Sequence, residues 1–217
     1  MRTSGNKDLF IFMGVKGDGK TTVATALMHQ LDQPTVIIDV ARQFDACDYR
    51  IVTYSIAELK YYLLNPIWSK AFRKGKLQIV FRPGEKIKKD IERACDVLKK
   101  VPNILIYFEE MEIYADNYLN KSSSIFNIVY LMRNRGHTII VVAKQAAKLS
   151  GLIKDMFDYF FLGSLESERS LAFFKDLGGK DLVSKIKATK HQEFLIVGRR
   201  AYTKRFKLDH KIARIVK

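Results

Sequence analysis

The sequence predicts an α/β protein with a mostly parallel central sheet flanked by helices and a C-terminal β-hairpin. Two observations support this fold class. Short apolar runs alternate with amphipathic stretches along the 217 residues, which is the pattern of repeated strand–helix units. A glycine-rich loop also joins the first apolar run directly to the first amphipathic stretch. The length favours a single domain over residues 1–217, with a core over about 8–208 and a basic tail over 209–217.

Each strand is expected from a short run of apolar, often β-branched residues, as in strands that a parallel sheet buries on both faces. These runs cover residues 8–13, 35–40, 50–55, 77–81, 103–108, 138–143 and 158–162. The expected helices cover residues 20–31, 56–64, 85–100, 122–133, 166–177 and 180–188, and Gly178-Gly179 separates the last two. Residues 194–197 and 201–208 are expected to form the closing hairpin around Gly198.

Charge and cysteine content restrict the class of protein. The net charge of +15 indicates a polyanionic partner, most often nucleic acid, with a solubilising surface as the alternative. Residues 70–100 and 185–217 each carry eleven basic residues, against four and two acidic ones. Cys47 and Cys95 form no metal-binding or disulfide pattern. No apolar run is long enough to cross a bilayer, so a soluble intracellular protein without a transmembrane segment is expected.

The residues after the first expected strand, GVKGDGKT, match the phosphate-binding pattern G-x-x-x-x-G-K-[ST]. Glycines let such a loop turn its backbone N–H groups towards a phosphate chain, and the following helix directs its N-terminus at the same place. Lys20 is expected to reach the β- and γ-phosphates, and the Thr21 hydroxyl to ligate Mg²⁺. This pattern indicates a P-loop NTPase whose nucleotide-binding residues are Gly14, Val15, Lys16, Gly17, Asp18, Gly19, Lys20, Thr21 and Thr22.

A second motif is the apolar run 104–108 followed by Glu109 and Glu110, as a Walker B site requires. Glu109 is assigned to Mg²⁺, directly or through its water shell, and Glu110 to the attacking water. The usual pair is Asp-Glu. Glu112 is a further acid nearby, and a solvated acidic turn is the alternative interpretation. Asp39 ends another expected strand and competes for the metal role, since an acid in that position often faces the acceptor substrate in small P-loop kinases.

Arg133 and Arg135 precede the expected strand 138–143, and Gln145 follows it. An arginine at this place could act as a finger on the γ-phosphate of a neighbouring subunit. A polar Gln145 at the carboxyl end of the strand would face the nucleotide, because ligands collect at that edge of such sheets. Ordinary surface positions are the alternative for these residues. His137 has no ligand partner in view and is interpreted as structural.

The order of the segments GVKGDGKT, VIID, ILIYFEE, RNRGHTIIVVAKQAAKL and DYFFLG resembles the FtsK–HerA superfamily of DNA-pumping ATPases. The resemblance implies a RecA-like core, ATP and Mg²⁺, a homo-oligomeric ring (hexamer or pentamer) and double-stranded DNA passing through its centre. It also implies that Gln145 senses the γ-phosphate and that Arg133 or Arg135 is the finger acting in trans, with Arg135 slightly favoured. The chain departs from the family pattern with Glu109 for aspartate and Lys144 for threonine, and its spacing from Gly136 to Gln145 is one residue longer.

Among these ATPases, a bare motor of this length resembles the genome-packaging ATPases of viruses with an internal membrane. That resemblance implies DNA loading into a capsid, with capsid or portal-vertex proteins as partners, in the host cytoplasm and at the packaging vertex of the virion. Residues 122–135 and the tail beyond Lys204 are the expected DNA contacts. The alternatives are a small-molecule or nucleotide kinase that uses Asp39 at its acceptor site, and a phage-assembly ATPase similar to zonula occludens toxin.

Overall fold

The computed structural model describes residues 7–199 and 203–207. Their strands form one sheet in the order β3-β4-β2-β5-β6-β1-β7-β8-β9. Neighbouring strands from β3 to β7 pair in parallel, and β7, β8 and β9 pair antiparallel. The fold class expected from the sequence is confirmed. The strands are β1 (Leu9–Met13), β2 (Thr35–Ile38), β3 (Arg50–Thr53), β4 (Gln78–Phe81), β5 (Leu105–Phe108), β6 (Thr138–Ala143), β7 (Tyr159–Leu162), β8 (Glu193–Gly198) and β9 (Thr203–Lys207).

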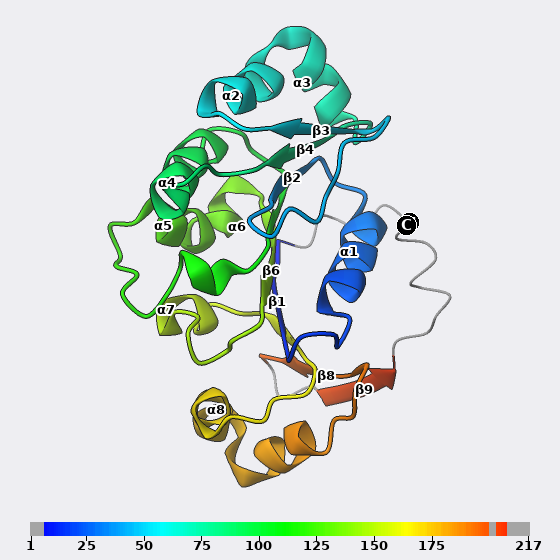
Figure 1. Ribbon diagram of the computed structural model, residues 1–217, viewed down its shortest axis with the longest axis vertical. Helices are drawn as coiled ribbons and strands as arrows, with labels where there is room; N and C mark the ends of the chain where they lie inside the picture. The colour runs from blue at the N-terminus through cyan, green and yellow to red at the C-terminus, as the bar shows by residue number, and fades with distance from the viewer. Residues whose placement is uncertain (1–6, 200–202, 208–217) are drawn as a thin grey trace.

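Helices cover both faces of the sheet (Figure 1). Helix α1 (Lys20–Leu31) packs on one face, while α4 (Ile87–Leu98), α5 (Ser124–Tyr130), α6 (Met132–Arg135) and α7 (Gly151–Lys154) cover the other. Helices α2 (Ile56–Leu64) and α3 (Pro66–Arg73) lie at the β3 end, and α8 (Glu168–Lys187) lies at the opposite end. A short 3-10 helix, η1 (Met111–Ile113), follows β5.

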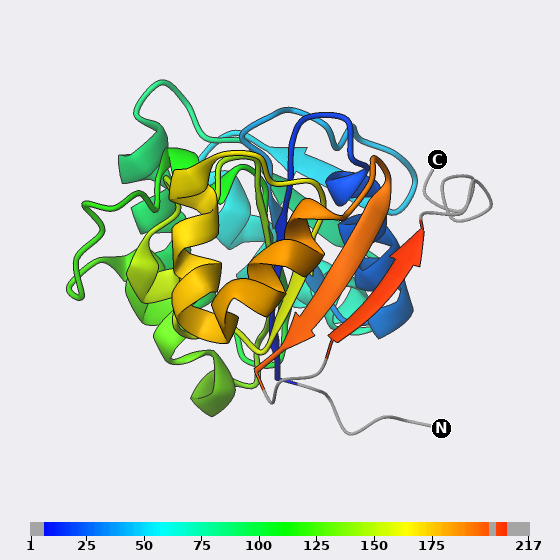
Figure 2. The same ribbon diagram turned by 90° about the horizontal axis from the view of Figure 1, so that it is seen from below.

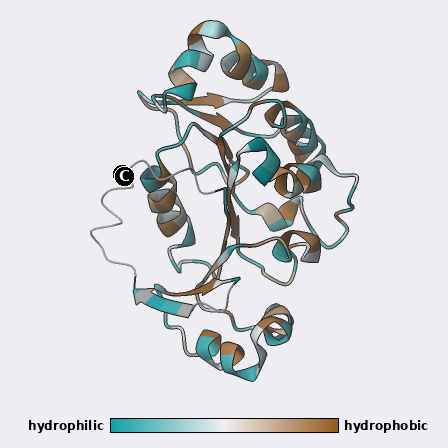
Figure 3. Ribbon diagram, turned by 180° about the vertical axis from the view of Figure 1, so that it is seen from behind, coloured by the Kyte–Doolittle hydropathy of each residue, from teal (hydrophilic) through white to brown (hydrophobic). Residues whose placement is uncertain are grey.

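The hydrophobic core forms two layers, one on each face of the sheet. In β1, Leu9, Ile11 and Met13 belong to the larger layer, and Phe10 and Phe12 belong to the smaller layer under α1. Successive side chains of a strand point to opposite faces, so both alternating sets must be apolar when both faces are covered. This explains why the central strands are continuous apolar runs and stand out in the hydropathy view (Figure 3).

The parallel strands place their carboxyl ends at one edge of the sheet. The segments after β1, β2, β5, β6 and β7 therefore begin at this edge, which we call the carboxyl edge. The segments that lead into these strands lie at the opposite, amino edge. In the sheet, β6 lies between β5 and β1. The residue that follows β6 thus stands between the phosphate-binding pattern after β1 and the acidic pair after β5.

Several elements differ from the sequence prediction. Helix α3 was not expected; it begins at Pro66, and the Asn65 side chain caps it by accepting a hydrogen bond from the N–H of Ile67 at 3.0 Å. The helix expected over 122–133 is divided at Leu131 into α5 and α6. The predicted Gly-Gly break is present inside α8, where Gly179 has φ 67° and ψ −165°. Figure 2 shows the two segments of α8 running in different directions. Residues 201–202, 208 and the predicted tail 209–217 lie outside the described residues.

Candidate active site

The phosphate-binding pattern forms the loop between β1 and α1. Gly17 and Gly19 have φ values of 92° and 85°, in the left-handed region that glycine adopts without strain. Helix α1 begins at Lys20, so its free N–H groups face the loop. The Lys20 ammonium donates a hydrogen bond to the carbonyl of Val15 at 2.6 Å, across the loop. Burial lowers the pKa of Lys20, and the neighbouring Asp18 and Glu109 carboxylates oppose this shift.

Asp18 fastens the phosphate-binding loop to distant parts of the chain. Its buried carboxylate accepts hydrogen bonds from the N–H groups of Val15 at 3.1 Å and Ser164 at 2.9 Å. The His191 Nδ1 lies 3.1 Å from the other carboxylate oxygen. A Cβ atom at Gly163 would stand 2.6 Å from Asp18 Oδ2, so this approach requires glycine. Sequence analysis missed this contact, because Ser164 and His191 lie 146 and 173 residues along the chain from Asp18.

The side chains of Thr21 and Glu109 meet next to the phosphate-binding loop. The Thr21 hydroxyl donates a hydrogen bond to Glu109 Oε1 at 3.1 Å, and Glu109 is only 1% exposed. Its second oxygen is buried without a hydrogen-bond partner among the described residues. Burial raises the pKa of Glu109 to about 7, against the nearby Tyr107 and Thr21 hydroxyls and the Lys144 charge. A hydroxyl beside an unsatisfied carboxylate oxygen is the oxygen donor set that Mg²⁺ prefers, so these residues fit the ion.

The residues after β5 and β6 are tied together. The Lys144 ammonium forms an ion pair with the Glu110 carboxylate. Glu112 Oε1 accepts hydrogen bonds from the N–H groups of Lys144 at 2.7 Å and Gln145 at 3.2 Å, which fastens the end of β6 to η1. Glu112 is therefore structural. A cavity of about 480 Å³ opens here, with Glu110, Lys144 and Gln145 on its wall.

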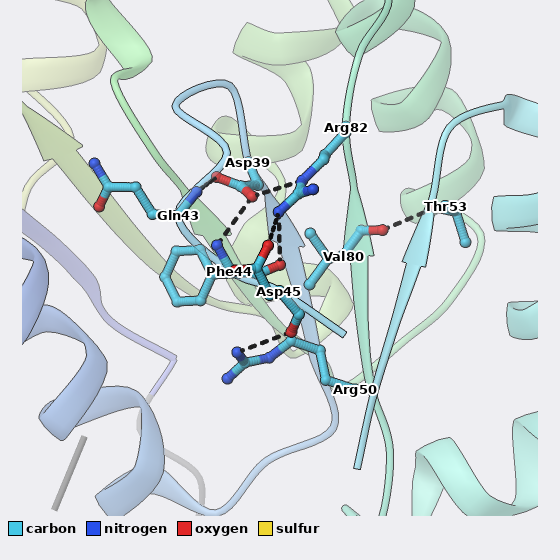
Figure 4. Close-up of polar contacts among 8 residues, drawn as sticks. All are labelled: Asp39, Gln43, Phe44, Asp45, Arg50, Thr53, Val80 and Arg82. Atoms are coloured by element: carbon cyan, nitrogen blue, oxygen red, sulfur yellow. Dashed lines mark hydrogen bonds and ion pairs between the residues drawn. The ribbon is translucent and has the colours of Figure 1, made fainter. Parts of the chain in front are cut away.

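Asp39, the competitor for the metal role, lies at the end of β2 with a fully buried carboxylate (Figure 4). It accepts hydrogen bonds from the N–H groups of Gln43 at 2.8 Å and Phe44 at 3.1 Å. It also pairs with Arg82 Nε at 3.1 Å, and the same guanidinium reaches Asp45 at 3.0 Å. Asp39 thus holds the loop after β2 in place, and its oxygens are occupied by this chain's own groups.

Arg133 and Arg135 lie in α6 at the amino edge, opposite the loop that holds Lys20. Arg133 forms an ion pair with Asp158, which precedes β7 and also accepts a hydrogen bond from the N–H of Leu9 at 2.9 Å. Arg135 is exposed, and no described residue forms an ion pair with its side chain. The structure brings Lys20, Thr21, Glu109, Glu110 and Gln145 to one edge and leaves both arginines at the other.

Two surface properties bear on possible partners. Lys86, Lys89 and Arg93 are exposed on and just before α4, and their helical spacing gives the helix a basic face. Over residues 7–199 and 203–207, no helix combines the length and the apolar composition that crossing a membrane requires.

A helix-flanked, mostly parallel sheet with a phosphate-binding loop between a buried strand and a helix defines the class of P-loop NTPases. Several solved structures have a similar fold. The genome packaging NTPase B204 from Sulfolobus turreted icosahedral virus 2, in complex with AMPPCP, matches with a TM-score of 0.74 and 14% identity, over 94% of this chain and 98% of that chain. B204, the DNA-packaging ATPase from Sulfolobus turreted icosahedral virus, matches with 0.69 and 17%, over 95% and 100%.

The N-terminal domain of zonular occludens toxin from Neisseria meningitidis matches with a TM-score of 0.52 and 12% identity, over 95% of this chain and 97% of that domain. No protein-family model and no curated protein matches the sequence. The chain therefore shares its fold with these packaging NTPases and with the toxin domain, and a P-loop ATPase fold was expected from the order of its motifs.

Proposed function

We propose that this protein is an ATPase that moves double-stranded DNA as a homo-oligomeric ring, and that its task is to package a viral genome. The observation that carries the proposal is the division of the candidate catalytic groups between two edges of the sheet. Lys20, Glu109 and Glu110 stand at the carboxyl edge, and Arg133 and Arg135 stand at the amino edge. A complete site then forms only where the amino edge of one subunit meets the carboxyl edge of the next.

The candidate catalytic residues at the carboxyl edge each have a role in hydrolysis. Lys20 and the loop N–H groups bind the β- and γ-phosphates, and Thr21 and Glu109 hold Mg²⁺, which neutralises phosphate charge when bound. Glu110 accepts a proton from the water that attacks the γ-phosphorus. The bond from that phosphorus to the bridging oxygen breaks, and ADP and inorganic phosphate leave. Gln145 lines the same cavity as Glu110. We infer that it reports the state of the γ-phosphate to the strand that precedes it.

The charge of the chain supports DNA as the polymer that is moved. A net charge of +15 attracts a polyanion without sequence specificity, which suits a motor that must act on every sequence of a genome. Capsid or portal-vertex proteins are the further proposed partners, in the host cytoplasm and at the packaging vertex. The predicted DNA contacts over residues 122–135 lie in and near α5 and α6, whereas most of the tail beyond Lys204 lies outside the described residues.

Two alternatives have less support. A kinase of the kind considered would need Asp39 at the acceptor site, but Asp39 is occupied by Arg82 and by backbone N–H groups. A phage-assembly ATPase shares the fold, yet the TM-score of 0.52 to the zonular occludens toxin domain is lower than the 0.74 to the packaging NTPase.

The first experiment measures ATP hydrolysis by the purified full chain with and without linear double-stranded DNA. DNA-stimulated hydrolysis is expected. The variant Glu110→Gln should bind ATP and lose about 10²–10⁴-fold in kcat, because a general base contributes that much. A chain that transfers phosphate to a small acceptor, and that neither binds nor responds to DNA, would overturn the translocase in favour of the kinase.

The second experiment tests whether the arginine acts across subunits. Glu110→Gln and Arg135→Ala are each expected to be inactive alone. When the two are mixed, an interface that joins a native Glu110 to a native Arg135 should recover activity. If the two variants mix at random in equal amounts, about a quarter of all interfaces join a native Glu110 to a native Arg135. The matched comparison repeats the mixing with Arg133→Ala instead of Arg135→Ala, because Arg133 already forms an ion pair with Asp158. No recovery with either arginine variant would contradict the proposed shared site.

A further inference from the structure

Lys144 occupies a central position in the candidate site. It follows β6 directly, and β6 lies between β5, which leads to the acidic pair, and β1, which leads to the phosphate-binding loop. Threonine is usual here in the resembling family, so the lysine adds a positive charge at a place where the family pattern has none.

The backbone of Lys144 is fixed, whereas its side chain can change partners. Its N–H donates to Glu112 Oε1 at 2.7 Å, and that carboxylate also holds the next residue. Its side chain is 40% exposed and borders the cavity of about 480 Å³. Lysine carries its charge on a flexible four-carbon stem, so the ammonium can move several ångströms without any shift of the strand.

The charge of Lys144 extends to the phosphate-binding groups. Burial is the largest influence on the pKa of Lys20, which it lowers, and on the pKa of Glu109, which it raises, and the Lys144 charge acts to lower both. Lys144 and Lys20 follow the neighbouring strands β6 and β1 at the carboxyl edge. A phosphate held by Lys20 would therefore end at the same edge of the sheet as the Lys144 side chain.

We propose that Lys144 recognises the terminal phosphate of a bound nucleoside triphosphate and, by moving to it, releases Glu110. This inference rests on the proposed function as an ATPase. While Lys144 pairs with Glu110, its ammonium occupies a carboxylate oxygen that would otherwise accept a hydrogen bond from water. A terminal phosphate carries more negative charge than a carboxylate and offers three oxygens, so it competes for the same ammonium. A diphosphate leaves the pair intact, and Glu110 becomes available only when there is a phosphate to cleave.

The backbone of Glu110 adopts an unusual conformation that fixes where its side chain begins. Its φ of 47° and ψ of 46° lie in the left-handed region, which a residue other than glycine adopts at some cost. The surrounding chain holds this conformation: the N–H of Ile113 donates to the Glu110 carbonyl at 3.0 Å, at the start of η1. The backbone therefore fixes the position of the Glu110 side chain. Whether its carboxylate can accept a hydrogen bond from water then depends on its ion pair with Lys144.

The test is a double-mutant cycle on nucleotide binding, measured by calorimetry with Mg²⁺ and without DNA. Affinities for a non-hydrolysable ATP analogue and for ADP are compared in the wild type, Glu110→Gln, Lys144→Gln and the double variant. Glu110→Gln should increase the preference for the analogue over ADP by roughly 5-fold, because Lys144 no longer has a competing partner. Lys144→Gln should reduce that preference by about 10-fold. The double variant should show the same preference for the analogue over ADP as Lys144→Gln alone.

Matched variants separate this role from a general loss of positive charge. Lys148 lies on the wall of the same cavity. The variant Lys148→Gln should leave the preference for the ATP analogue over ADP unchanged. Lys144→Arg keeps the charge and should retain most of the preference. The proposal is overturned if Lys144→Gln binds like the wild type, or if the gain from Glu110→Gln persists without Lys144. A wild type that binds no nucleotide would refute the proposed function itself. Hydrolysis that ignores DNA would refute only the DNA-motor proposal, because this cycle contains no DNA.

Discussion

Burial raises the pKa of Glu109 to about 7, whereas a glutamate in the unfolded chain titrates near 4.5. Between these values the folded state holds a proton that the unfolded state has lost, so folding stability falls as pH rises from about 4.5 to 7. The cost above pH 7 is about 3 kcal/mol from this shift. Glu109 thus weakens the fold at the pH where its carboxylate would be ionised to hold the proposed Mg²⁺.

The variant Glu109→Gln should remove this cost. We expect its free energy of unfolding at pH 8 to exceed that of the wild type by about 1–3 kcal/mol, and the two to converge near pH 4.5, where both side chains are neutral. Urea unfolding at several pH values measures the difference. A difference that stays constant from pH 4.5 to 8 would show that the Glu109 carboxyl is not the titrating group.

His137 produces a pH dependence of the opposite sign. It is fully buried, neither ring nitrogen has a hydrogen-bond partner among the described residues, and burial, with a contribution from Arg135, lowers its pKa to about 4. The unfolded chain gains this proton near pH 6.5, so stability falls as pH drops from 6.5 towards 4. The variant His137→Leu should remove that slope, worth up to about 3 kcal/mol, and change stability at pH 8 by less than about 1 kcal/mol. Urea unfolding at pH 4.5 and pH 8 measures both, and a steeper acid slope in the variant would refute this role for His137.

At the scale of elements, the phosphate-binding loop contacts the segment after β7 closely because Gly163 in that segment has no side chain. Gly163→Ala would place a Cβ atom 2.6 Å from Asp18 Oδ2, so the loop must shift or the contact must break. We expect a loss of about 1–3 kcal/mol in stability, as for other steric changes in packed positions. ATP affinity should fall by about 10-fold, because the loop loses its fixed shape.

Gly151→Ala is the control for this substitution. A Cβ atom at Gly151 meets no other atom within 4 Å, so the variant should keep wild-type stability and ATP affinity. Thermal unfolding and calorimetric titration compare the two variants. Equal behaviour of the two would mean that the approach of Gly163 to Asp18 does not matter for the loop.

Elements whose causes lie in adjacent residues could be predicted from the sequence. Helix α1 runs over Lys20–Leu31 as expected, since the strand, the glycine-rich loop and the amphipathic run follow one another. Helix α3 escaped prediction: it has only eight residues, and Ile67 in its first turn is 77% exposed, so its apolar pattern does not mark a buried face. The roles of Asp18 and Asp39 also escaped, because their partners are set by tertiary contacts.

For the molecule as a whole, sequence order predicted which groups would gather at one edge of the sheet but not how they pair there. The Lys144–Glu110 ion pair joins residues that follow different strands, so only the order β5-β6-β1 reveals it. The placement of Arg133 and Arg135 at the far edge follows from the parallel direction of β6 and could be expected once the sheet was known. Their action on a neighbouring subunit stays a proposal.

The charge of the whole molecule gives a prediction for DNA binding. If many lysines and arginines contact phosphates, the logarithm of the affinity should fall linearly with the logarithm of the salt concentration. The loss should reach about 10³-fold between 50 and 200 mM for six or more contacts. Duplexes of unrelated sequence should bind within about 2-fold of one another, as no base readout is expected. Fluorescence anisotropy measures both. A strong preference for one sequence would contradict a general motor.

The contact between Asp18 and His191 has a mechanical consequence. His191 lies two residues before β8, so the antiparallel end of the sheet is attached to the loop where nucleotide binds. Thermodynamic linkage makes such an attachment work in both directions. If nucleotide binding shifts His191 and the hairpin behind it, a load that pulls on the hairpin must change nucleotide affinity by a matching free energy. If the protein is the proposed motor, a stalled motor would therefore sense the resisting force in its own nucleotide pocket and adjust its turnover without a separate sensor.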